Sequence, residues 1–79
     1  MGTLLEYVSE QGNFTYLSDM RLSTHYKTLV VILDSLTEDA FPFSEWVYFF
    51  SYISGIHSEK TTLQTLREEI RQWCITHAT

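Results

Sequence analysis

The chain has 79 residues, of which 44% are hydrophobic and 15% aromatic, and its formal net charge is −5. With only three Gly and one Pro, this composition excludes a disordered chain and predicts one compact domain over residues 1–79. The single cysteine excludes an intrachain disulfide framework, and no apolar run approaches the roughly 20 residues of a membrane span. The N-terminus lacks the basic start and apolar core of a signal peptide, so we expect a soluble, cytoplasmic protein.

The first predicted helix covers residues 4–11. Thr3 and Glu6 have the spacing of a capping box, in which each side chain accepts a hydrogen bond from the other residue's backbone N–H. Gly12 supplies the stop signal. The residues that follow allow two interpretations, a short fifth helix within 14–22 or an irregular loop whose apolar side chains enter the core.

The second predicted helix covers residues 24–36, with Ser23 or Thr24 as its cap. Its apolar residues fall on one broad arc of a helical wheel, which is typical of a helix that packs on a core. Val31 falls on the opposite, polar side. The arc consists of Tyr26, Leu29, Val30, Ile32, Leu33 and Leu36.

The third predicted helix covers residues 43–54 and follows a break over residues 37–43. Pro42 favours a helix start, because a helix does not need the N–H of its first residues. Gly55 is a left-handed terminator, and Ile56 stands where a Schellman motif places its apolar contact.

The fourth predicted helix covers residues 62–76, with Thr61 and Gln64 as its capping box. Its apolar residues form a two-heptad seam. Such a seam can pack on the chain's own core or pair with a second copy of the chain, so a homodimer is one of two alternatives. The seam consists of Leu63, Leu66, Ile70 and Trp73. The pattern as a whole predicts an all-α bundle of four helices, or five with the segment 14–22.

No catalytic motif is recognisable. A nucleophile elbow, a dinucleotide-binding glycine loop and a phosphate-binding loop are all absent from the sequence. Cys74 stands near the end of a helix, where the dipole disfavours a thiolate. Cys74 and His77 are three residues apart, but two ligands do not make a structural zinc site, which needs four. We therefore expect neither an enzyme nor a metal or cofactor site.

Acidic residues are concentrated in the middle of the chain. Between Lys27 and Lys60 there is no Lys or Arg. Phosphate backbones are recognised by clustered cations, so direct nucleic-acid binding is not expected. The acids favour a protein partner with a basic surface, or they simply solvate helix ends. They are Asp34, Glu38, Asp39 and Glu45.

The helix 43–54 carries the predicted partner-binding surface. Tyr48 and Tyr52 lie opposite its apolar arc, and Phe49 lies at the edge of that arc. Tyrosine is enriched at protein interfaces, because it offers a large rigid area with a polar tip. The alternative is that another segment covers both tyrosines. The predicted contact residues are Tyr48, Tyr52, Phe49, Glu45, Glu38 and Asp39.

The tripeptide Asp34-Ser35-Leu36, the acidity of the chain and the stretch "TTLQTLREEI" resemble acyl carrier proteins. The resemblance implies that Ser35 carries a phosphopantetheine arm at the start of a helix. This chain departs from that pattern in two ways. The predicted helix puts Ser35 in its last turn, and Pro42 interrupts the helix that follows the serine in a carrier.

The stretches "EDAFP" and "FFSYISG" resemble the small bacterial YozE-like helical proteins, whose fold is similar to that of SAM interaction domains. This resemblance implies a helical bundle and adds no mechanism. The sequence thus predicts a small acidic helical protein that binds another protein, as an adaptor, an assembly subunit or a stoichiometric inhibitor of the phage or plasmid type. The alternative is a carrier-like protein modified at Ser35.

Overall fold

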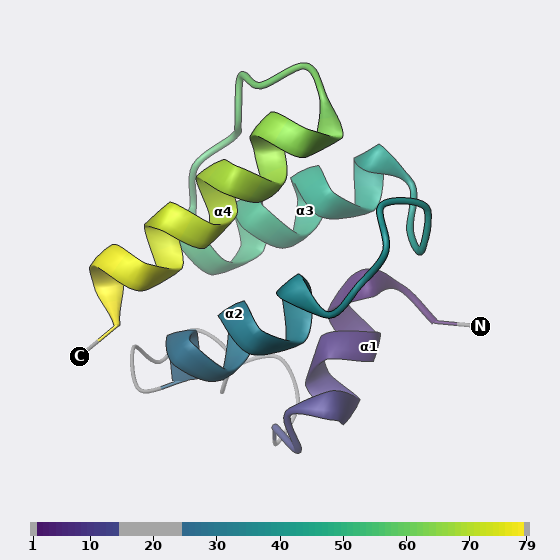
Figure 1. Cartoon of the computed structure of the whole chain (residues 1–79), viewed down its shortest axis with the longest axis vertical. Coiled ribbons are helices and arrows are strands. Elements are labelled where there is room, and N and C mark those ends of the chain that lie inside the picture. Colours follow the sequence, from purple (N-terminus) through teal and green to yellow (C-terminus); the bar gives the residue numbers. More distant parts are fainter. Residues whose placement is uncertain (1, 15–24, 79) are drawn as a thin grey trace.

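The described part of the chain contains four helices, which confirm the predicted all-α class (Figure 1). The computed structural model describes residues 2–14 and 25–78. The fifth helix predicted within 14–22 lies outside these residues except for Phe14, which is not helical. The helices are α1 (Leu4–Gln11), α2 (Tyr26–Asp34), α3 (Phe43–Ser54) and α4 (Leu63–His77).

Helix α1 begins at the predicted capping box. The Thr3 hydroxyl accepts from the Glu6 N–H at 3.1 Å, and a Glu6 carboxylate oxygen accepts from the Thr3 N–H at 3.2 Å. The stop differs from the prediction, because Gly12 keeps a right-handed conformation with φ −89°. Asn13 takes the left-handed turn with φ 56°, a conformation that asparagine tolerates better than most residues.

Helix α2 is shorter at its C-terminus than predicted, ending at Asp34 rather than at residue 36. The reason is Ser35, whose hydroxyl donates to the Ile32 carbonyl at 2.6 Å and competes with the backbone for that acceptor. The predicted caps Ser23 and Thr24 lie outside the described residues. As the wheel predicts, Val31 faces outward, with 70% of its surface exposed.

Helix α3 has the predicted bounds, with Pro42 as its N-cap residue and Gly55 in the left-handed region at φ 76°. The Gly55 N–H donates to the Ser51 carbonyl at 2.8 Å, which is the single bond of an αL cap. The predicted Schellman contact of Ile56 is wrong. The Ile56 N–H instead donates to the Ser54 hydroxyl at 3.0 Å, and the side chain is exposed.

Helix α4 begins one residue later than predicted, because Thr62 rather than Thr61 is the cap. The Thr62 hydroxyl accepts from the Thr65 N–H at 3.3 Å, so the predicted pair of Thr61 with Gln64 is wrong. No described helix has the length and apolar character needed to cross a bilayer.

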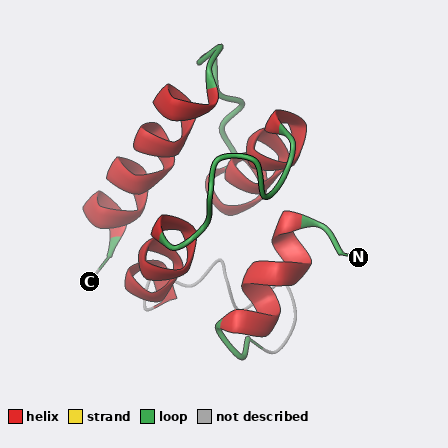
Figure 2. Ribbon diagram, turned by 45° about the vertical axis from the view of Figure 1, so that its right-hand side comes forward, coloured by secondary structure: helices red, strands yellow, loops and turns green. Residues whose placement is uncertain are grey.

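One core joins the four helices. Helix α4 packs on α2 and α3, while α1 packs on α2 and α3 from the other side (Figure 2). Three aromatic side chains of α3, Trp46, Phe49 and Phe50, have at most 1% of their surface exposed. Burying such a ring stabilises the fold by roughly 1.5–3 kcal/mol, so these three rings make a large contribution to the stability of the core. The other core residues are Leu4, Leu5, Val8, Tyr26, Leu29, Leu33, Ile53, Leu66, Ile70 and Cys74.

Candidate functional site: an acidic groove beside helix α1

Fewer aromatic side chains of α3 are exposed in the structure than the sequence pattern predicts. Tyr48 is exposed over 58% of its surface. Tyr52 is half-buried and packs against the core. Phe49 has no exposed surface, so it is a core residue and not a partner contact. The edge of the apolar arc, where the wheel places Phe49, is covered by neighbouring helices.

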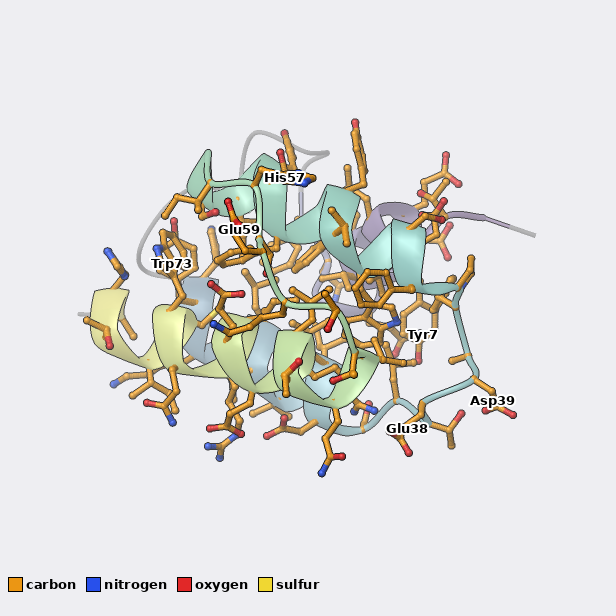
Figure 3. All side chains as sticks on the ribbon, turned by 90° about the horizontal axis from the view of Figure 1, so that it is seen from above. Tyr7, Glu38, Asp39, His57, Glu59 and Trp73 are labelled. Carbon is orange, nitrogen blue, oxygen red and sulfur yellow. The ribbon has the colours of Figure 1, made fainter. Side chains whose placement is uncertain are left out.

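The predicted acidic residues lie at the end of the molecule where α3 begins. Glu38 and Asp39 are exposed on the turn after α2, and Figure 3 shows both at the same end as Tyr7, away from His57 and Glu59. The Asp39 carboxylate accepts from the Thr37 hydroxyl at 2.9 Å, which holds the turn.

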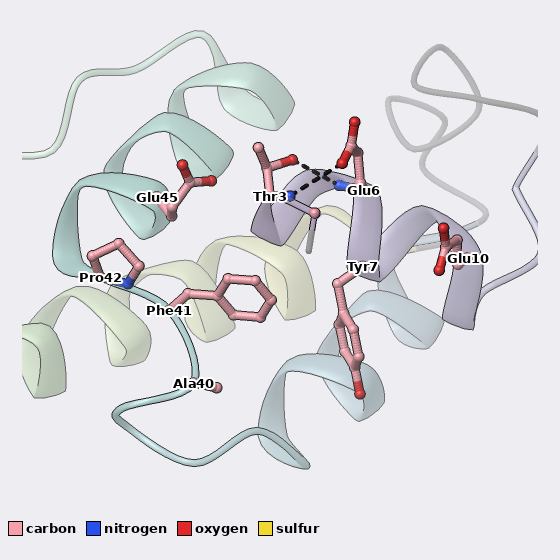
Figure 4. Close-up of a pocket in the computed structure, with 9 residues that line it drawn as sticks. Thr3, Glu6, Tyr7, Glu10, Ala40, Phe41, Pro42 and Glu45 are labelled. Carbon is pink, nitrogen blue, oxygen red and sulfur yellow. Dashed lines mark hydrogen bonds between the residues drawn. The ribbon is translucent and has the colours of Figure 1, made fainter.

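A groove of about 440 Å³ lies beside Glu45, between α1 and the segment that leads into α3 (Figure 4). Its volume is within the range of roughly 300–1,000 Å³ in which ligand sites are found. Three carboxylates and two aromatic rings line it. The lining residues are Gly2, Thr3, Glu6, Tyr7, Glu10, Ala40, Phe41, Pro42 and Glu45.

Two of the groove carboxylates are fixed by the first turn of α1. The Glu6 carboxylate accepts from the Thr3 N–H at 3.2 Å, and the Glu45 carboxylate accepts from the Leu4 N–H at 3.2 Å. Since Thr3 and Leu4 are consecutive, both carboxylates converge on one helix end. The positive end of the helix dipole stabilises the two negative charges there.

The wall of the groove is aromatic. Tyr7, on α1, and Phe41, in the segment before α3, are both half-buried. Their ring centroids are 5.8 Å apart at an interplanar angle of 55°, a tilted pair. Figure 4 shows Glu45 and Glu6 on either side of Thr3, with the Phe41 and Tyr7 rings below them. The groove thus combines fixed negative charge with an aromatic surface.

Most of the groove is missing from the sequence predictions. The sequence pattern indicates Glu6 only as a cap and gives no role to Glu10, Tyr7 or Phe41. The sequence does indicate part of the groove. Glu6 and Glu10 are four residues apart, and Tyr7 and Glu10 are three apart, so these residues share the side of α1 that is away from its apolar face. The position of Phe41 and Glu45 across from them depends on a contact between distant parts of the chain.

The two described arginines, both on α4, are engaged by other groups of the chain and do not line the groove. Arg67 donates to the carbonyls of Leu33 at 3.2 Å and Leu36 at 2.8 Å, and its guanidinium lies 5.0 Å from the Trp46 ring centroid. Arg71 forms an exposed ion pair with Asp34 at 3.1 Å. No Lys, Arg or His is among the described residues that line the groove.

The seam of α4 faces the chain's own core, which is one of the two alternatives that its sequence pattern leaves open. Leu66 and Ile70 have at most 1% of their surface exposed, while Leu63 and Trp73 are half-buried against the same core. The Trp73 ring makes an edge contact with Tyr26 at a centroid distance of 4.9 Å. A homodimer through this seam would require the bundle to open.

The two reactive candidates from the sequence have ordinary structural roles. Ser35 follows the last residue of α2, whereas the carrier resemblance implies a serine that begins a helix. Cys74 is fully buried, and burial raises the pKa of its thiol from 9.0 to about 12, so it is protonated at neutral pH. Among the described residues, no group of three or more His, Cys, Asp or Glu side chains is placed to hold a metal ion.

Comparison of the chain with protein-family models, with curated proteins and with solved structures gives no match. Neither the carrier resemblance nor the YozE-like resemblance is therefore supported by a family match.

Proposed function

We propose that this chain acts by binding a basic segment of a partner protein in the groove beside α1. The observation that carries the proposal is the lining of the groove, in which Glu6, Glu10 and Glu45 stand beside the Tyr7 and Phe41 rings without a described cation. Because the helix end already holds the two carboxylates in place, little conformational entropy is lost when a cation binds to them. The binding could serve an adaptor, an assembly subunit or a stoichiometric inhibitor.

The charge of the surroundings supports a basic partner. Exposed Asp39 precedes Ala40 of the groove and continues the negative surface toward the turn after α2. Glu38, on the same turn, lines a separate hollow with Arg67 and Arg71. The chain as a whole carries −5. Such a field speeds the association of a basic partner, repels acidic surfaces and nucleic acids, and weakens as salt increases. Exposed Tyr48, one turn after Glu45 on α3, extends the surface on the other side.

Selection from a display library of random peptides tests the proposal, because the library offers basic, neutral and acidic segments in equal measure. The immobilised protein should enrich peptides that contain Arg or Lys beside an aromatic or aliphatic residue. The counter-target is the double variant Glu6→Gln/Glu45→Gln. Glutamine keeps the acceptor oxygens for Thr3 and Leu4, so the caps remain while both charges are removed.

The matched control is Glu59→Gln/Glu68→Gln, which makes the same change in net charge at two exposed residues outside the groove. The proposal predicts that the control retains the selected peptides and that the groove variant loses them. Peptides without basic residues, or equal retention by both variants, would contradict it.

A further inference from the structure

We infer that the groove recognises an arginine side chain of the partner in preference to a lysine side chain. The inference rests on the proposed function and names the group that enters the site. It follows from how the carboxylates are held, from the aromatic wall beside them and from the room that the groove offers.

The orientation of the carboxylates suits a forked donor. Glu6 and Glu45 each use one oxygen, Oε1, for a backbone N–H of α1, and no hydrogen bond among the described residues engages the other oxygen. The two remaining oxygens are therefore presented by side chains whose rotamers are already fixed. A guanidinium carries five N–H donors in a rigid plane and can bond more than one carboxylate oxygen at a time, whereas an ammonium is a compact, strongly hydrated point charge.

The aromatic wall adds a second preference for a planar cation. A guanidinium stacks on an aromatic face while its edge stays free for carboxylates, a combination that an ammonium does not offer. The fold already contains such a stack, in which the Arg67 guanidinium lies over the Trp46 ring while it donates to the Leu33 and Leu36 carbonyls. Tyr7 and Phe41 offer comparable faces beside Glu6 and Glu45.

The groove suits an organic cation better than a metal ion. Its volume of about 440 Å³ leaves room for a whole side chain. Its carboxylates are not among any cluster of three metal-ligating groups in the described residues. The partner group is therefore an extended cation that enters the groove and contacts the aromatic wall.

Titration with three small probes tests the inference directly. N-acetyl-arginine amide, N-acetyl-lysine amide and N-acetyl-citrulline amide are added to the isotopically labelled protein, and backbone amide shifts are followed by NMR. Citrulline matches arginine in shape but lacks the charge. We expect the arginine probe to shift the amides of Thr3, Leu4 and Tyr7 and to bind at least about threefold more tightly than lysine, with citrulline weakest.

Two variants separate this inference from the proposed function. In Tyr7→Leu, which keeps an apolar contact for Phe41, the advantage of arginine over lysine should fall while some binding remains. In Glu6→Gln/Glu45→Gln, both cationic probes should weaken. Equal binding of arginine and lysine to the wild type, with loss of both in the double variant, would overturn the arginine preference and leave the proposed function intact. If the probes shift the amides of the double variant as much as those of the wild type, or if the groove amides do not shift at all, both the arginine preference and the proposed function are overturned.

Discussion

Tyr48 and Phe49 are adjacent residues with opposite surroundings, because consecutive helical residues point about 100° apart. Replacing Phe49 by Ala removes a fully buried ring, and we expect it to lower the free energy of unfolding by about 3–5 kcal/mol. Replacing exposed Tyr48 by Ala should change it by about 0.5 kcal/mol or less. Urea denaturation followed by circular dichroism measures both.

If Phe49→Ala is too unstable to fold, Phe49→Leu can be measured in its place. Leucine keeps most of the buried volume, so the free energy of unfolding should fall by less. An Ala substitution at Phe49 as mild as the one at Tyr48 would show that Phe49 is a surface residue and would restore it as a partner contact.

Cys74 gives the fold a specific dependence on alkaline pH. Burial raises the pKa of its thiol from 9.0 to about 12, so the unfolded chain loses this proton at a lower pH than the folded chain. The contribution is fully present below about pH 9 and is lost as the pH rises toward 12, by at most about 1.4 kcal/mol per pH unit. Cys74→Ala should show a shallower loss of stability over this window in urea denaturation. Identical slopes for wild type and variant would contradict the assignment.

At the level of elements, Arg67 of α4 caps the C-terminus of α2. It bonds the Leu33 and Leu36 carbonyls and stacks on Trp46, so Arg67→Ala leaves two acceptors without this donor. We expect a loss of about 1–3 kcal/mol in the free energy of unfolding.

Arg71 lies one turn further along α4 and is the matched control. Its ion pair with Asp34 is about half-exposed on both sides, so Arg71→Ala should cost about 0–1 kcal/mol. Thermal denaturation distinguishes the two variants, and an equal effect of both would mean that Arg67 does not stabilise the junction of α2 and α4.

The helices could be predicted because their signals are local. The capping box of Thr3 with Glu6, the start at Pro42 and the stop at Gly55 each depend on neighbouring residues, and the structure has each of them. Two of the errors occur where two neighbours compete for one role. Asn13 rather than Gly12 takes the left-handed turn, and Thr62 rather than Thr61 caps α4.

The groove could be predicted only in part, because it depends on tertiary contacts. Glu45 stands out in the sequence for its charge, yet its partner, the Leu4 N–H, is 41 residues away. Phe41 meets Tyr7 only because α1 packs against the start of α3. Helical periodicity reveals which side of a helix is polar, but not which other segment lies across from it.

Considered as a whole, the molecule holds its described arginines away from the groove. Carboxylates without a described cationic neighbour line the groove beside α1, while Arg67 and Arg71 are engaged between α2 and α4. Under the proposed function, we expect a partner with a basic segment to be drawn to the end of the molecule that holds the groove. Added salt should weaken its binding, mainly by slowing association, because exposed charges are screened over about 10 Å at 0.1 M salt.

The central claim is that the groove binds a basic segment, and a peptide titration tests it most directly. A fluorescent peptide selected on the wild type is titrated with the wild type, with Glu6→Gln/Glu45→Gln and with the control Glu59→Gln/Glu68→Gln. Losing two charge interactions at about 0.5–1 kcal/mol each predicts that the groove variant raises Kd by about 5–30-fold while the control changes it little. Equal Kd values for the groove variant and the control would contradict the claim.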